Sequence, residues 1–220
     1  MADTIHKTVK NGNLAVSDNW ERSLAVARAG RNQIVTKKDN SQKGGHQSTA
    51  SPSPWVARFA GLVPDGAPVA DIACGGGRHG RLFLDRGHPV LLADRDVSGV
   101  SDLAEQPGAE ILQADFEGGD DWPLVDRTFG AVIVTNYLWR PILPKLVSLV
   151  GPGGLLIYET FAEGNEAYGR PRNPDFLLRP GELLETVRGH LDVIGYEQCI
   201  LHRPGPAVVQ HIAARRKTRG

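Results

Sequence analysis

The residues best suited to binding a ligand form a glycine-rich run at positions 71–80, which reads DIACGGGRHG. An apolar stretch precedes the run and a helix-like stretch follows it, so the run is predicted to turn the chain from a strand into a helix. Glycine at such a turn tolerates positive φ and leaves room for a ligand against the main chain. The run therefore predicts a binding site at which several backbone N–H groups converge.

The same run permits more than one ligand. Gly75, Gly77 and Gly80 satisfy the G-x-G-x-x-G spacing of dinucleotide-binding turns, and Asp94 ends the next apolar stretch, where a carboxylate holds ribose hydroxyls. This interpretation predicts an NAD(P)-binding Rossmann oxidoreductase. Two alternatives remain: a glycine turn that binds nothing, and a non-catalytic scaffold that acts through a partner.

The elements that must position this turn alternate between helix and strand from residue 54 onward. The segments that read as strands are 69–73, 89–94, 110–114, 129–134, 155–158, 193–201 and 207–213. The segments that read as helices are 55–62, 78–85, 101–106, 143–150 and 182–187. Such alternation is typical of an α/β fold in which helices cover both faces of a parallel sheet. A long irregular stretch, 161–180, is predicted to cap the site.

Length and composition bound the domain organisation. The chain has 220 residues, 40% of them hydrophobic, which is enough for one sizeable core. Residues 37–54 are almost entirely polar, so 1–50 are predicted to form a flexible or disordered arm, 51–215 the folded domain and 216–220 a basic tail.

Charge and cysteine content exclude some classes of partner. Lys plus Arg equals Asp plus Glu at 25 each, so no net field draws the chain to nucleic acid or to an anionic membrane. No apolar run is long enough to span a bilayer, and two cysteines make no disulfide framework. We therefore expect a cytoplasmic protein without membrane contact, either a monomer or a homodimer.

The glycine run resembles the first motif of class I S-adenosylmethionine (SAM) dependent methyltransferases, D-x-G-C-G-x-G-R. The chain is most similar to the small bacterial type that includes tellurite-resistance methyltransferases, and the resemblance covers roughly 55–213. Asp94, Asp115, the turn 151–156 and the hairpin at the end of the chain match the family in order. The resemblance implies SAM as the cofactor. It also implies a Rossmann-like seven-stranded sheet, mostly parallel, with an antiparallel last strand and helices on both faces.

The resemblance also implies which residues bind the cofactor. Asp94 is expected on the ribose, and Asp115 on the adenine amino group beside the apolar Phe116. Ala73 departs from the family, which usually has glycine there; alanine is tolerated if φ is negative at that position. Cys74 is interpreted as a small packing residue of the turn. The full expected set is Asp71, Ala73, Cys74, Gly75, Gly77, Asp94, Arg95, Asp115, Phe116 and Thr135.

The candidate catalytic residues follow the fourth and fifth strands. Asn136 lies roughly where amino-group methyltransferases carry N-P-P-[YF], although the residues after it do not complete that signature. Tyr137 is suited to a flat or cationic substrate, or to the core, and Glu159 to a general base or a salt bridge. His79 is expected on the surface.

The reaction partner is less defined than the cofactor. The acceptor of the methyl group is expected to be a small molecule, with a nucleic acid or protein acceptor left open. No metal is expected.

Overall fold

A computed structural model describes residues 51–119, 122–202 and 205–218. The strands are β1 (Val69–Ile72), β2 (Val90–Asp94), β3 (Ala109–Gln113), β4 (Phe129–Thr135), β5 (Val150–Phe161), β6 (Asp192–Leu201) and β7 (Ala207–Arg215). The α-helices are α2 (Pro54–Phe59), α3 (Arg78–Leu84), α4 (Leu143–Ser148) and α5 (Glu182–Val187). The 3₁₀ helices are η1 (Ala60–Leu62), η2 (Val97–Leu103), η3 (Arg140–Ile142), η4 (Asn165–Ala167) and η5 (Pro174–Phe176). The predicted arm, 1–50, lies outside the described residues.

The seven strands form a single sheet in the order β3-β2-β1-β4-β5-β7-β6. The pairs among β1 to β5 are parallel, whereas β7 runs antiparallel to both of its neighbours, β5 and β6. The predicted seven-stranded, mostly parallel α/β sheet with an antiparallel last strand is therefore confirmed.

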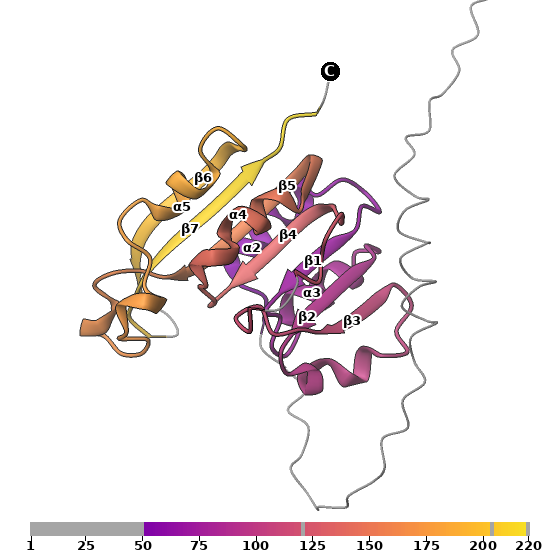
Figure 1. Cartoon of the computed structure of the whole chain (residues 1–220), viewed down its shortest axis with the longest axis horizontal. Coiled ribbons are helices and arrows are strands. Elements are labelled where there is room, and N and C mark those ends of the chain that lie inside the picture. The colour runs from indigo at the N-terminus through magenta and orange to yellow at the C-terminus, as the bar shows by residue number, and fades with distance from the viewer. Residues whose placement is uncertain (1–50, 120–121, 203–204, 219–220) are drawn as a thin grey trace, which may run out of the picture. The chain divides into compact units, whose positions relative to one another are not determined.

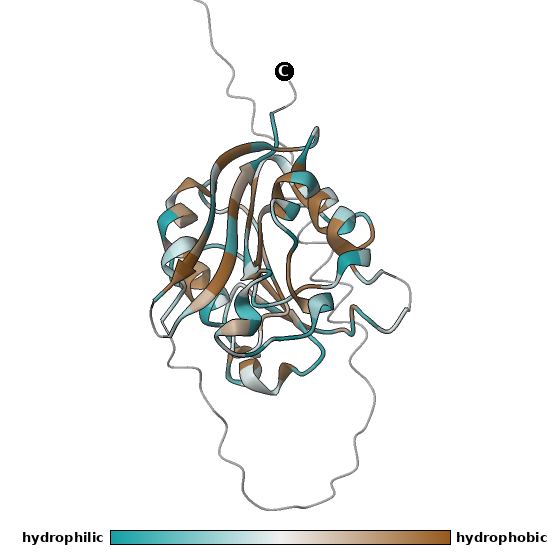
Figure 2. Ribbon diagram, turned by 90° about the vertical axis from the view of Figure 1, so that its left-hand side faces the viewer, coloured by the Kyte–Doolittle hydropathy of each residue, from teal (hydrophilic) through white to brown (hydrophobic). Residues whose placement is uncertain are grey.

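Helices cover both faces of this sheet (Figure 1). α2 packs against β5, and α3 against β1 and β2, while α4 and α5 pack together over β5 and β7. Residues of β1 and β4 are almost all buried, and in Figure 2 hydrophobic stretches, coloured brown, alternate with hydrophilic ones along the strands that face the viewer. The α-helices have only six or seven residues, and none in the described part of the chain is long and apolar enough to cross a membrane.

The structure differs from the sequence predictions at three places. β5 begins at Val150, so the glycines at 151, 153 and 154 lie within the strand. The pairing of β5 with β4 shifts register there, between Phe129 and Ala131 of β4. A Cβ on Gly154 would lie 2.8 Å from the Phe129 carbonyl oxygen, so this close pairing needs glycine. The helix predicted at 101–106 is instead the 3₁₀ helix η2. The stretch 161–180 contains η4 and η5 and a bridge between Ala162 and Leu178.

Candidate functional site

The glycine turn joins β1 to α3 and contains three residues in the left-handed conformation. Ala73, Gly75 and Gly77 have φ values of 53°, 52° and 69°. The turn is closed by the Gly77 N–H, which donates to the Cys74 carbonyl at 2.8 Å. The predicted strand-turn-helix arrangement is therefore present, and Cys74 is a buried packing residue in the hydrophobic core, as predicted.

The two glycines at positive φ have different reasons to lack a side chain. A Cβ on Gly77 would lie 2.6 Å from Val100 Cγ1 and 2.9 Å from Leu92 Cδ2, so this residue packs the turn onto η2 and β2. A Cβ on Gly75 would meet nothing within 4 Å. The main chain at Gly75 is thus open on the side where a ligand would approach.

Ala73 does not satisfy the condition expected from the sequence. Its φ of 53° is left-handed, a conformation that costs a residue with a Cβ about 1–2 kcal/mol. The condition under which alanine would be tolerated without strain, a negative φ, is therefore not met. The residue therefore holds strain that glycine would not have.

Asp71 stabilises the turn through its side chain. Its side chain is buried, and its Oδ2 accepts a hydrogen bond from the Gly80 N–H at 2.8 Å, which ties the first turn of α3 to β1. Burial raises the pKa of Asp71 to about 7, although the Gly80 N–H and the charge of Arg78 act to lower it. Asp71 is thus a structural carboxyl beneath the turn.

Asp94 connects the turn to the end of β2. Its Oδ2 accepts a hydrogen bond from the Gly75 N–H at 2.8 Å, and its Oδ1 accepts one from the Asp96 N–H at 3.0 Å. The next residue, Arg95, accepts a hydrogen bond at its carbonyl from Gln113 Nε2. The carboxylate is therefore held in place at the carboxyl edge of the sheet, where open α/β sheets bind ligands.

A pocket of about 350 Å³ opens at this edge. The residues that line it are Ala73, Asp94, Arg95, Ala114, Asp115, Phe116, Glu117, Asn136, Tyr137 and Phe176. The structure thus brings together five of the expected cofactor residues and two of the expected catalytic residues. The other expected residues, Asp71, Cys74, Gly75, Gly77, Thr135 and Glu159, do not line it.

Asp115 and Phe116, which line one part of the pocket, are exposed and partly exposed, respectively. Asp115 Oδ1 accepts a hydrogen bond from the Glu117 N–H at 2.9 Å, and the Phe116 ring packs against Trp122 with centroids 5.5 Å apart. On the opposite wall the Tyr137 hydroxyl is buried. Burial raises the pKa of Tyr137, and the nearby Glu117 raises it further, so the phenol stays protonated at neutral pH.

Phe176 is a pocket residue that sequence reasoning missed. It lies in η5 of the stretch 161–180, and Arg140 holds the chain on both sides of it through the carbonyls of Asp175 and Leu177 at 2.8 and 2.7 Å. The Arg140 guanidinium also forms an ion pair with Glu182 at 2.7 Å. Of the stretch 161–180, which was predicted to cap the site, Phe176 is thus the residue that lines the pocket. Only these long-range contacts show that Phe176, rather than another residue of 161–180, lines the pocket.

Thr135 and Glu159 lie at strand ends outside the pocket. Thr135 Oγ1 lies 3.4 Å from His79 Nδ1. The Glu159 carboxylate accepts a hydrogen bond from Ser53 Oγ at 2.6 Å, whereas the Glu159 carbonyl accepts one from the Asn136 N–H. Glu159 therefore contacts the pocket wall through its backbone, and its side chain holds the start of α2.

His79 is buried, so the prediction that it lies on the surface is wrong. It is 1% exposed, and its Nε2 accepts a hydrogen bond from the Ser53 N–H at 3.2 Å. Burial lowers the pKa of His79 to about 4, and the charge of Arg78 acts in the same direction. The segment before α2 covers this residue, which no local pattern around the glycines could reveal.

A larger cavity lies elsewhere. It has a volume of about 1080 Å³ and opens between α4 and α5, beside Arg188 and Arg216. No residue predicted to bind cofactor or to act in catalysis lines it. We therefore assign the candidate site to the smaller pocket at the glycine turn.

Solved structures with a similar fold include several methyltransferases. TehB from Haemophilus influenzae has a TM-score of 0.59 and 18% identity over 78% of this chain, which spans 64% of the length of that protein. A TehB-like SAM-dependent methyltransferase from Corynebacterium glutamicum has a TM-score of 0.54 and 19% identity, over 93% of this chain and 100% of that one. The glycopeptide N-methyltransferase MtfA, solved with S-adenosyl-L-homocysteine (SAH), has a TM-score of 0.53 and 20% identity, over 76% and 91%.

The sequence itself is less informative in such comparisons. No protein-family model matches it, and no curated protein matches it. The identities to the solved structures are 20% or lower, so the likeness shows the fold alone. The strand order and the antiparallel β7 agree with that likeness. The chain therefore has the fold of the class I SAM-dependent methyltransferases.

Proposed function

We propose that this chain is a SAM-dependent methyltransferase that acts on a small-molecule acceptor. The observation that carries the proposal is the glycine turn, whose Gly75 N–H is fixed by Asp94 at the mouth of a pocket that Asp115 and Phe116 also line. This arrangement lies on a fold shared with proteins described as SAM-dependent methyltransferases. The antiparallel β7 is not expected of an NAD(P)-dependent oxidoreductase, which makes that alternative the weaker one.

The residues of the pocket fit such a cofactor by their chemistry. Asp94 offers a fixed carboxylate to the ribose hydroxyls, and Asp115 offers one to the adenine amino group, beside the ring of Phe116. The open main chain at Gly75 leaves room for the amino-acid end. Acidic side chains around the pocket also favour a cofactor with a positive sulfonium.

The protein's contribution to methyl transfer is orientation and exclusion of water. When bound, SAM supplies an electrophilic methyl group, and the acceptor displaces SAH in line. Asn136 and Tyr137 form the pocket wall, where they would orient the acceptor by hydrogen bonds. The raised pKa of Tyr137 makes its hydroxyl a hydrogen-bond donor at neutral pH rather than a base. Phe176, which also lines the pocket, would add an apolar side chain beside the bound molecules.

The proposal is tested by calorimetry of the purified protein against SAM, SAH, NAD and NADP. We expect SAM and SAH to bind, and Asp94→Ala to weaken both by roughly 10- to 100-fold, because hydrogen bonds to a charged group contribute about 1.5–3 kcal/mol. Asp65→Ala is the matched control, since Asp65 is an exposed acid in the turn before β1.

Each other outcome has a definite meaning. Binding of NAD or NADP alone would contradict the proposal in favour of an oxidoreductase, and silence from all four compounds would favour a scaffold. If SAM binds, a screen of small molecules for SAH formation tests the acceptor class. Turnover only with a protein or nucleic acid would reject the small-molecule part of the proposal.

A further inference from the structure

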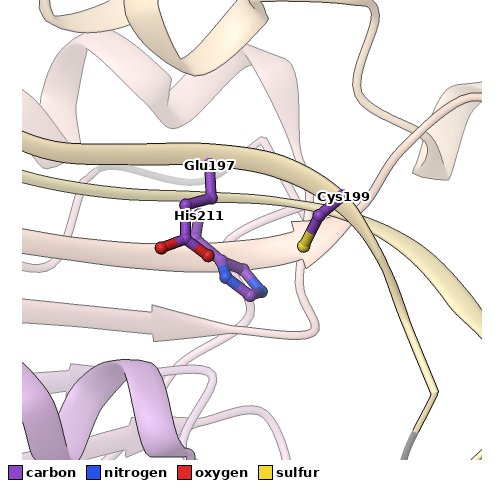
Figure 3. A group of neighbouring side chains, drawn as sticks. All are labelled: Glu197, Cys199 and His211. Atoms are coloured by element: carbon purple, nitrogen blue, oxygen red, sulfur yellow. The ribbon is translucent and has the colours of Figure 1, made fainter.

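A second group of reactive side chains lies on the antiparallel part of the sheet, outside the cofactor pocket. Glu197 and Cys199 belong to β6 and His211 to β7, and one ligand atom of each lies within 4.8 Å of the other two. Figure 3 shows the Glu197 carboxylate beside the His211 ring and the Cys199 sulfur directed toward it. The strand register explains this grouping, because Glu197 pairs with His211 and Cys199 follows two residues later on the same face.

His211 has a buried ring nitrogen to which no described residue forms a hydrogen bond. The residue is 6% exposed, and its Nδ1 has no hydrogen-bond partner within 51–119, 122–202 and 205–218. Its Nε2 faces the Glu159 carboxylate at 3.8 Å, and the Trp55 ring covers the imidazole with centroids 5.0 Å apart. Buried polar atoms are normally satisfied, so an unpaired ring nitrogen beside a thiol and a carboxylate indicates a missing ligand.

We propose that Glu197, Cys199 and His211 bind a Zn²⁺ ion. Thiolate, imidazole and carboxylate together suit Zn²⁺, whereas Mg²⁺ and Ca²⁺ prefer oxygen ligands alone. Binding forms a zinc–sulfur bond at Cys199 and releases the thiol proton to solvent. Three protein ligands leave the fourth tetrahedral position open to water or to another small ligand.

The surroundings of this zinc site support an ion with access to solvent. Glu197 is exposed and Cys199 is half-buried, so the ion can enter from the surface and Glu197 can rotate toward it. Glu159 lies behind the ring, in the place of the carboxylate that commonly orients a zinc-bound histidine. Sequence reasoning expected no metal because the three residues lie on two strands and form no local motif.

Arg58 competes with the ion for Glu197. Its Nη1 lies 3.3 Å from Glu197 Oε1, and both side chains are largely exposed. An exposed pair of this kind contributes little to stability. We therefore expect Arg58→Met to free the carboxylate and to strengthen Zn²⁺ binding.

The test uses the untagged full chain after removal of metal with a chelator. Zn²⁺ is titrated by calorimetry, and Co²⁺ by absorbance, because a cobalt–thiolate bond gives a charge-transfer band in the near ultraviolet. We expect one Zn²⁺ per chain and a Co²⁺ band that is lost in Cys199→Ala. We also expect Zn²⁺ affinity to fall roughly tenfold or more in His211→Ala. Cys74→Ala is the matched control, since Cys74 is the other cysteine and it lies in the core.

Several results would overturn the proposal. Among them are the absence of a Co²⁺ band in the unaltered protein, a band that persists in Cys199→Ala, and unchanged Zn²⁺ affinity in His211→Ala. His211→Asn is a second variant of similar shape, and near-ultraviolet circular dichroism of each variant shows whether it has folded. A folded His211→Asn variant with full affinity would likewise reject the site.

Discussion

Ala73, the residue that begins the glycine turn, has a strained backbone conformation. Its left-handed φ of 53° is easy for glycine and unfavourable for alanine, while glycine loses more entropy on folding. We expect Ala73→Gly to raise the free energy of unfolding by about 0.5–1 kcal/mol, measured by urea denaturation. The control is Ala104→Gly, because Ala104 is exposed with a φ of −59° and should lose stability. A loss of stability in Ala73→Gly would contradict the strain argument.

His79 is the buried residue with the clearest dependence on pH. Its pKa in the folded chain is about 4, below the ordinary value of 6.5, so the unfolded chain takes up a proton first as pH falls. The contribution of His79 to stability is therefore complete above pH 6.5 and is lost between about pH 6.5 and 4. The loss amounts to about 3 kcal/mol at most.

The His79 contribution is measured as a difference, because Asp71 titrates with the opposite sign. The pKa of Asp71 is raised from 3.8 to about 7, so its contribution is complete below pH 3.8 and is lost as pH rises from 3.8 to about 7. Unfolding of the unaltered chain is compared with that of His79→Gln from pH 7 to pH 4. We expect the unaltered chain to lose more stability over this range. A constant difference, or an imidazole that titrates near 6.5 by NMR, would show that His79 is solvated.

At the scale of elements, Arg140 links η3 to the cap that carries Phe176. Its guanidinium contacts two carbonyls of the cap as well as the Glu182 carboxylate, a geometry that an ammonium cannot reproduce. We expect Arg140→Lys to loosen the cap, so that trypsin cleaves sooner after Arg172, whose next residue is Asn173. If the cofactor proposal holds, SAM affinity should fall roughly tenfold at the same time.

The control for Arg140→Lys is Arg188→Lys. Arg188 is an exposed arginine whose guanidinium pairs with Glu185 in α5, three residues earlier in the chain. Trypsin digestion is independent of any ligand, so it tests the role of Arg140 even if SAM does not bind. Equal cleavage rates in the two variants would mean that other contacts hold the cap closed.

The elements that were predictable from sequence are those whose signal is local. Buried parallel strands such as β1, β2 and β4 read as short apolar runs, and the glycine turn has its own spacing. The start of β5 was not predictable, because glycines normally interrupt a strand and here permit a tight approach to Phe129. The low strand propensity of these glycines was therefore interpreted as a turn before the strand, although the strand runs through them.

At the scale of the whole molecule, predictability depends on sequence separation. Asp94 was placed by its position at the end of an apolar run after the glycine turn, and Asp115 by the family resemblance, whereas Phe176 reaches the pocket through contacts made by Arg140. The burial of His79 depends on Ser53, 26 residues earlier. Contacts of this kind leave no periodic signal, so only the assembled sheet and its covering segments reveal them.

The position of β7 in the sheet has a consequence for synthesis on the ribosome. β7 is inserted between β5 and β6, although both are made before it. A nascent chain that has emerged up to Leu201 already contains every residue that lines the pocket at the glycine turn, but one edge of β5 still lacks its neighbour. The last strand to be synthesised thus completes the interior of the sheet. Until residues 207–215 emerge, the unpaired edge of β5 can form hydrogen bonds with strands of other nascent chains.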